Sequence, residues 1–116
     1  MNNKPKYNLF KNTKYEIDGF KHAYKTESSF KLELFLSIFI FGIIYIIDIN
    51  LIYKLILITT AFLVLIVELL NSAIENVVDL VTKEIHPLAK SAKDIGATAV
   101  MFSIVLHLLC WCIILF

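Results

Sequence analysis

Three long apolar stretches constrain this 116-residue chain more than any other feature. Residues 34–47 and 55–67 carry no charge, and residues 95–116 contain no Lys, Arg, Asp or Glu. As helices rising about 1.5 Å per residue, the first two cover only about 20 Å, less than the roughly 30 Å hydrocarbon core of a bilayer. We therefore expect each span to extend into its flanking polar residues. With 59% hydrophobic residues and a mean hydropathy of +0.77, the chain is too apolar for a soluble domain.

The pattern predicts an all-α integral membrane protein that forms a single domain over residues 1–116. We expect an amphipathic surface helix at about 8–25 and three transmembrane helices at about 30–48, 52–80 and 88–116. Phe10, Ile17, Phe20 and Tyr24 recur at helical intervals before the first span, as in a helix that lies in the membrane interface. Pro87 suits the first turn of the last helix.

Lysines are distributed unevenly along the chain. Seven precede the first span, three lie between the second and third spans, and one lies elsewhere: Lys4, Lys6, Lys11, Lys14, Lys21, Lys25 and Lys31; Lys83, Lys90 and Lys93; and Lys54. The positive-inside rule then places the N-terminus and residues 80–94 in the cytoplasm. Interleaved acidic residues dilute the basic N-terminus, which argues against nucleic acid as a partner. The start of the chain has no signal-peptide pattern, so we expect it to be retained whole in the membrane.

Five side chains of the predicted spans have simple structural interpretations. Cys110 and Cys112 are about 200° apart around a helix, so we expect them to be apolar filler and not a disulfide. His107, in mid-span, is expected to form a hydrogen bond that packs helices together. Trp111 and Tyr53 are expected to be interfacial anchors.

A polar stripe continues the second span in the sequence "ELLNSAIENVVDL", residues 68–80. At 100° per residue, Asn71, Glu75 and Asp79 lie at about −60°, −20° and +20° from Glu68, so all four share one helix face. Asp79 fits a solvated helix end equally well. Glu68 does not, because a carboxylate at the hydrocarbon edge costs on the order of 2 to 3 kcal/mol and such acids usually mark function. We expect Glu68 to act as a general base, with Asn71 as its orienting partner.

Other residues of this cytoplasmic end indicate phosphate chemistry. Glu75 and Glu27 are candidate ligands for Mg²⁺, which binds hard oxygens and substrate phosphates. Lys90 and Lys93 share a helix face at the start of the third span, where they fit either a phosphate clamp or positive-inside anchoring. No glycine-rich phosphate loop occurs in the sequence, so bound ATP would not rest on one.

The stripe resembles the signature of a known family. "ELLNSAIE" at 68–75, "AKD" at 92–94 and "TESSFKLE" at 26–33 are similar to motifs of the prokaryotic diacylglycerol kinase family, over residues 8–116. The resemblance implies a homotrimer of three-span subunits in the bacterial cytoplasmic membrane. It implies composite active sites between subunits, and transfer of the γ-phosphoryl of MgATP to the primary hydroxyl of a membrane lipid. Mg²⁺ and ATP are thus the expected cofactor and co-substrate.

The same resemblance implies roles for individual residues. Glu68 is the expected catalytic base, and Asn71 supports it. Glu27 and Glu75 are the expected metal ligands. The expected nucleotide contacts are Tyr15, Glu27, Glu75, Glu84, Ile85, His86, Lys93 and Asp94. The expected lipid-substrate contacts are Lys21, His22, Ala23, Tyr24, Ser29, Phe30, Lys31, Leu32, Glu33, Lys54 and Glu68.

Two positions depart from the family pattern. Asn8 stands where many relatives have Arg, so Lys6 or Lys11 would have to make that nucleotide contact. Ala97 stands where some relatives have Ser, which removes a hydrogen bond to substrate there.

Two alternatives remain open from sequence. Family members that resemble this chain in "HPLAK" and "VVDLV" phosphorylate undecaprenol; the N-terminal segment and "WCIILF" favour diacylglycerol. A non-enzymatic transporter or assembly subunit would explain Glu68 as an intramembrane acid, but gives no use to Glu27, Lys93 and Asp94.

Overall fold

The computed structural model describes residues 6–116, so Lys4 of the N-terminal lysines lies outside the described residues. Four helices follow one another: α1 (Leu9–Thr26), α2 (Ser28–Ile46), α3 (Leu51–Val81) and α4 (Pro87–Leu115). Over residues 6–116 there is no strand. Three of the helices, α2, α3 and α4, are long and apolar enough to cross a membrane. The predicted all-α architecture with one surface helix and three spans is confirmed.

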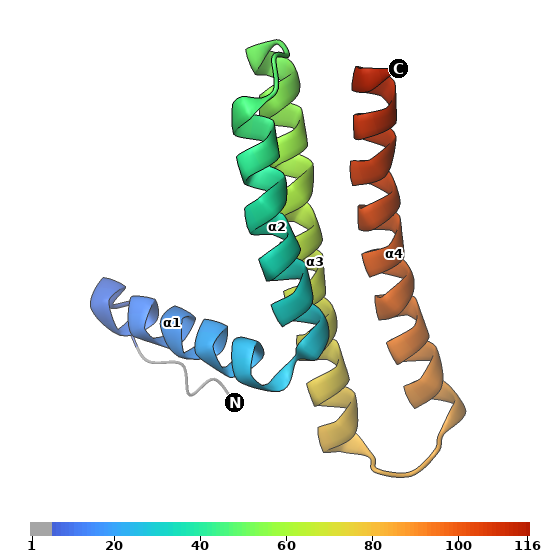
Figure 1. Cartoon of the computed structure of the whole chain (residues 1–116). Helices are drawn as coiled ribbons and strands as arrows, with labels where there is room; N and C mark the ends of the chain where they lie inside the picture. Colours follow the sequence, from blue (N-terminus) through green and yellow to red (C-terminus); the bar gives the residue numbers. More distant parts are fainter. Residues whose placement is uncertain (1–5) are drawn as a thin grey trace.

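Helix α1 leaves the bundle at an angle to the other three (Figure 1). It begins at Asn8, whose side-chain oxygen accepts hydrogen bonds from the backbone N–H groups of Phe10 (3.0 Å) and Lys11 (3.2 Å). Asn is among the preferred residues for such a cap. The residue that departs from the family's Arg therefore has a local structural role, because it fixes the start of the surface helix.

Helices α2 and α3 form an antiparallel pair. Glu27 is in an extended conformation between α1 and α2, and so forms the elbow at which the chain turns into the bundle. At the far end, the Asn50 side chain caps α3 by accepting a hydrogen bond from the Ile52 N–H (2.9 Å). Lys54 Nζ donates to the Tyr45 carbonyl oxygen (3.0 Å), which satisfies an open carbonyl in the last turn of α2.

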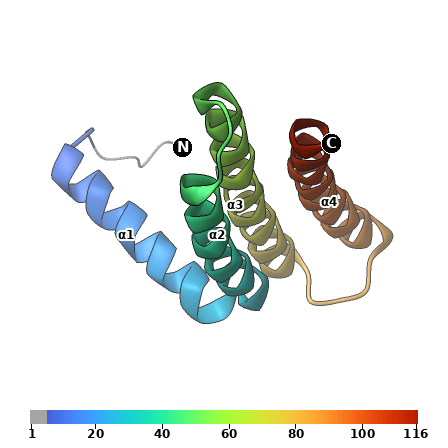
Figure 2. The ribbon, with the colours of Figure 1, turned by 45° about the horizontal axis from the view of Figure 1, so that its top comes forward.

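The chain returns from α3 to α4 through the short segment 82–86. His86 caps α4 by accepting a hydrogen bond from the Leu88 N–H (3.1 Å), and Pro87 occupies the first turn as expected. Figure 2 shows α1 beside α2 and α4 on the other side of α3. The order of packing is thus α1, α2, α3, α4.

Helix length separates a membrane part of α3 from an aqueous part. The 19, 31 and 29 residues of α2, α3 and α4 correspond to about 28, 46 and 43 Å of helix. A hydrocarbon core of roughly 30 Å therefore leaves about three turns of α3 and about two turns of α4 outside it. In Figure 1 the end of α3 continues past the start of α2, toward the 82–86 turn.

Few apolar side chains are buried within one chain. The apolar window of α3 is 44% buried, whereas those of α2 and α4 are 17% and 11% buried. Helix α3 is therefore the central helix, and most of the α2 and α4 surface is left uncovered by the rest of the described chain. A small core at the elbow contains Ala23, Phe30 and Leu65, with Leu34 packed against it.

A hydrogen-bonded cluster joins α3 to α4 within the membrane. His107 Nδ1 lies 2.7 Å from Thr60 Oγ1, and the Trp111 Nε1–H donates to His107 Nε2 at 3.0 Å. Because Nε2 accepts, the neutral ring carries its proton on Nδ1 and donates to Thr60. The helix-packing role predicted for His107 is confirmed. Trp111, which the sequence predicts to be an interfacial anchor, donates its ring N–H to this cluster.

Candidate functional site

The polar stripe of α3 is buried at its membrane end and opens toward its aqueous end. Glu68 is 5% exposed and Asn71 7% exposed. Glu75 and Asp79 are partly exposed. The helix therefore carries its carboxylates from a closed environment into an open one, along the single face that the sequence predicts.

Further acidic residues converge on Glu68. Glu33 of α2 lies beside it, and Glu75 and Glu27 are close enough to act electrostatically on its carboxyl group. None of these four carboxylates has an ion pair among residues 6–116. A cluster of acidic groups with low-dielectric walls attracts cations. The elbow at Glu27 and the start of α2 are thus what complete the acidic cluster around α3.

Asn71 has a different partner from the one predicted. Its Nδ2 donates a hydrogen bond to Glu75 Oε1 at 3.2 Å, while its Oδ1 is buried and has no hydrogen-bond partner among the described residues. Among the described residues Asn71 thus forms a hydrogen bond with Glu75 and none with Glu68, and its support of Glu68 stays a prediction. Both carboxylates are within one helical turn of Asn71, and the side chain turns toward Glu75.

Two ion pairs hold the lysines of α4. Lys93 Nζ lies 2.7 Å from Asp79 Oδ1 on α3, and Lys90 Nζ lies 2.5 Å from Asp94 Oδ2 one turn further along α4. Lys93 also lies within electrostatic reach of Glu75. Asp79 is therefore more than a solvated helix end, because it joins α3 to α4 beside the acidic cluster.

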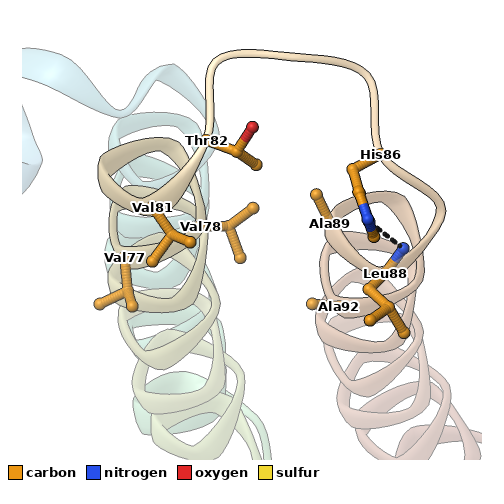
Figure 3. Close-up of a pocket in the computed structure, with 8 residues that line it drawn as sticks. All are labelled: Val77, Val78, Val81, Thr82, His86, Leu88, Ala89 and Ala92. Carbon is orange, nitrogen blue, oxygen red and sulfur yellow. Dashed lines mark hydrogen bonds between the residues drawn. The ribbon is translucent and has the colours of Figure 1, made fainter.

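The aqueous ends of α3 and α4 enclose open space. A cavity of about 340 Å³ lies between Val77, Val78 and Val81 of α3 and Leu88 and Ala89 of α4. Figure 3 shows the side chains that line it. An adjacent cavity of about 280 Å³ is more polar. It is lined by Val78, Asp79, Thr82, Lys83, Glu84, Ile85, His86, Ala89, Lys90 and Lys93. The predicted nucleotide residues 84–86 therefore surround the same space as Lys93.

Not every predicted nucleotide residue joins this region. Tyr15 is exposed on α1. Helix α1 lies away from the turn that joins α3 to α4 (Figure 1). Glu27 instead lines a groove of about 490 Å³ between α1 and α3, with Ser72 and Asn76 on the opposite side. Within one chain the predicted nucleotide contacts are thus divided among two regions and the outer part of α1.

The predicted lipid contacts also divide. Ala23 (7% exposed) and Phe30 (1% exposed) are core residues. Tyr24, Lys31 and Leu32 line an open groove of about 390 Å³ on α1 and α2, with the Lys31 ammonium 5.0 Å from the centre of the Tyr24 ring. The remaining members of the set are placed as follows: Lys21, His22 and Ser29 are exposed, and Glu33 is partly buried beside Glu68.

Lys54 lies far from the rest of the predicted lipid set. It is fourteen residues from Glu68, about 21 Å along α3, at the end of the bundle where it binds the Tyr45 carbonyl. The structure therefore does not bring Lys54 to the acidic cluster. It instead gives Lys54 a partner at the end of α2.

Sequence reasoning missed the contact between Asn71 and Gly96. Gly96 of α4 is buried, and a Cβ atom built on it would overlap the Asn71 amide oxygen. The available signal was a glycine three residues after Lys93, on the same face of α4. Periodicity cannot reveal which residue of another helix such a glycine faces.

Fold and site together define a class: an integral membrane protein with three spans, whose acidic cluster meets lysines at one end of the bundle. The chain belongs to the prokaryotic diacylglycerol kinase family, whose model matches residues 14–115. The predicted resemblance is confirmed. The chain is thus an enzyme, a kinase of the membrane.

Curated relatives carry the same description. A diacylglycerol kinase of Escherichia coli (strain K12) is 37% identical over 107 residues, which cover 92% of this chain and 88% of the relative. One from Pseudomonas aeruginosa is 37% identical over 103 residues, 89% of this chain and 84% of the relative. One from Helicobacter pylori (strain 26695) is 37% identical over 103 residues, 89% of this chain and 80% of the relative.

Proposed function

We propose that this enzyme transfers the γ-phosphoryl group of ATP to the primary hydroxyl of diacylglycerol, giving phosphatidic acid and ADP. The observation that carries the proposal is the placement of Glu68, which is buried beside Glu33 yet lies on the same face of α3 as Glu75 and Asp79. Asp79 in turn pairs with Lys93 of α4. A lipid hydroxyl approaches from the membrane side of such a stripe, and a nucleotide approaches from the aqueous side. The names of the relatives support diacylglycerol as the acceptor.

Glu68 is the proposed general base. It takes the hydroxyl proton while the hydroxyl oxygen bonds to the γ-phosphorus, and the bond from that phosphorus to the bridging oxygen breaks to release ADP. Lys93 offsets negative charge on the transferred group. The 5% exposure of Glu68 limits the access of water, which favours the lipid hydroxyl over hydrolysis.

Glu75 and Glu27 are the proposed ligands for Mg²⁺. Among residues 6–116 there is no group of three or more metal-binding side chains. Two carboxylates nevertheless fit the requirement, because Mg²⁺ in kinase sites is commonly held by one or two carboxylates plus substrate phosphates. When bound, Mg²⁺ supplies positive charge against the phosphate oxygens. The contribution of Asn71 is to hold Glu75 Oε1 in place.

We further propose that the protein is a homotrimer in the cytoplasmic (inner) membrane, with the N-terminus and the acidic cluster on the cytoplasmic side. The lysines near residues 80–94 support this orientation through the positive-inside rule. Separation of Glu27, Tyr15 and the 84–86 segment within one chain supports sites that neighbouring subunits complete. Cross-linking in native membranes tests the assembly: trimers are expected, and exclusively monomeric protein contradicts it.

Undecaprenol is the remaining alternative acceptor, because the phosphoryl-transfer residues do not choose the lipid. A direct test uses purified protein, ATP labelled on its γ-phosphate and each lipid separately, followed by thin-layer chromatography. We expect labelled phosphatidic acid at a much higher rate than labelled undecaprenyl phosphate. Label on undecaprenol alone would overturn the proposed acceptor and keep the kinase assignment.

A further inference from the structure

Gly96 is the position at which α4 comes closest to the polar stripe of α3. A Cβ atom built on Gly96 would overlap Asn71 Oδ1 and lie 3.3 Å from Asn71 Cγ, whereas Gly19 and Gly42 have nothing within 4 Å of such an atom. The Asn71 amide therefore occupies the space that a side chain at position 96 would fill.

The two polar atoms of the Asn71 amide have different surroundings. Its Nδ2 donates to Glu75 Oε1, and its Oδ1 points at the Gly96 backbone, buried and without a hydrogen-bond partner among the described residues. A buried amide oxygen with no partner is rare, and it persists only where its surroundings fix it. The room left by Gly96 is what permits this orientation of the amide.

Contacts on both sides fix the register of α3 and α4 around Gly96. Thr60 is eleven residues from Asn71 on α3, and His107 is eleven residues from Gly96 on α4. The contact between Thr60 and His107 therefore lies about three turns further into the membrane than the contact between Asn71 and Gly96. On the aqueous side, Lys93 of α4 pairs with Asp79 of α3. Helix α4 is thus tied to α3 above and below Gly96. An added methyl group at Gly96 is therefore accommodated mainly by movement of the Asn71 side chain.

We propose that Gly96 is a positioning residue for the divalent cation and nucleotide phosphates, acting through Asn71 on Glu75. The inference rests on the proposed function, in which Glu75 is a metal ligand. Partners that orient a metal ligand commonly change metal affinity by about 10- to 100-fold when they are altered. Gly96 reaches the ligand through one further residue, so the lower end of that range applies.

The test compares Gly96→Ala with Gly42→Ala, its matched control. Both substitutions add one methyl group to a transmembrane helix, and both raise helix propensity equally. Binding of Mn²⁺, a spectroscopic substitute for Mg²⁺, is followed by electron paramagnetic resonance in lipid bilayers with a non-hydrolysable ATP analogue. We expect the Mn²⁺ dissociation constant to rise on the order of tenfold for Gly96→Ala and to stay unchanged for Gly42→Ala. Equal affinities in the two variants overturn the proposal.

A double variant tests the route through Asn71. Asn71→Ala removes the amide that the new methyl group would displace, so Gly96→Ala is expected to add no further loss in that background. The same fold loss in both backgrounds would mean that Gly96 acts elsewhere, and would overturn the proposal. If Gly96→Ala alone does not fold, the double variant is compared with Asn71→Ala: equal Mn²⁺ affinity supports the route, and weaker affinity overturns it.

Failure of the proposed function gives a different result. If the unaltered protein binds no Mn²⁺ together with the ATP analogue, the proposal that Glu75 is a metal ligand is overturned. The positioning role of Gly96 is then overturned as well, because it depends on that proposal. If the unaltered protein binds Mn²⁺ and the two glycine variants bind equally, only the role of Gly96 is overturned.

Discussion

Lys93 of α4 and Asp79 of α3 form an ion pair of 2.7 Å across the gap between the two helices, next to the acidic stripe. The pair directs the lysine toward the face that carries Glu68 and Glu75. It also gives Asp79 a role at the end of the stripe. From the sequence alone, Asp79 could equally well be a solvated residue at the end of a helix.

The ion pair predicts the behaviour of Asp79→Asn. Both side chains are about half exposed, so we expect little loss of stability from breaking the pair. Lys93 would lose its orientation, and the KM for MgATP is expected to rise a few-fold with little change in kcat. Steady-state kinetics at fixed lipid measure this. A large fall in kcat with an unchanged KM would show that Asp79 acts in the chemical step.

Glu75→Gln is expected to weaken the dependence of activity on Mg²⁺. The substitution keeps the size of the side chain and a possible contact with Asn71, but removes the charge that a hard cation requires. The measurement is activity against free Mg²⁺, with Asp48→Asn as the control, since Asp48 is exposed between α2 and α3 at the opposite end of the bundle. We expect saturation only at higher Mg²⁺ for Glu75→Gln. Identical titrations of Glu75→Gln and the unaltered protein would refute the assignment of Glu75 as a metal ligand.

His107→Phe is expected to reduce stability more than activity per folded molecule. The change removes the hydrogen bonds to Thr60 and from Trp111. Thr60 lies eight residues before Glu68, about 12 Å along α3. Hydrogen bonds between transmembrane helices are worth about 0.6 to 2 kcal/mol each, so we expect the free energy of unfolding in mixed micelles to fall by about 1 to 3 kcal/mol. Val105→Ala is the control, because Val105 is exposed on the same helix. A loss no larger than that of the control would mean that the cluster contributes no stability.

The helices and the stripe were predictable from sequence for physical reasons. Apolar runs of this length have few alternatives to membrane helices, and the phase of Glu68, Glu75 and Asp79 follows from the geometry of an α-helix. Pro87 marked the start of α4 because proline suits a first turn.

The contacts between helices were not predictable in the same way. Asn71 has carboxylates at both neighbouring turns, Glu68 and Glu75, and helical spacing cannot choose between them. The choice depends on Gly96, which is on another helix and is placed by the register of α3 against α4. Similarly, the hydrogen bond from Trp111 to His107 depends on the position of the His107 ring, which contacts Thr60 on the other helix.

The most direct test of the central claim is phosphoryl transfer by Glu68→Gln. The substitution keeps the shape of the side chain and removes its ability to take a proton from the lipid hydroxyl. Purified protein, diacylglycerol in mixed micelles and ATP labelled on the γ-phosphate give the turnover, and binding of a non-hydrolysable ATP analogue gives the nucleotide affinity. We predict that turnover falls at least about 100-fold while the analogue binds as before. Near-normal turnover in Glu68→Gln would contradict the account.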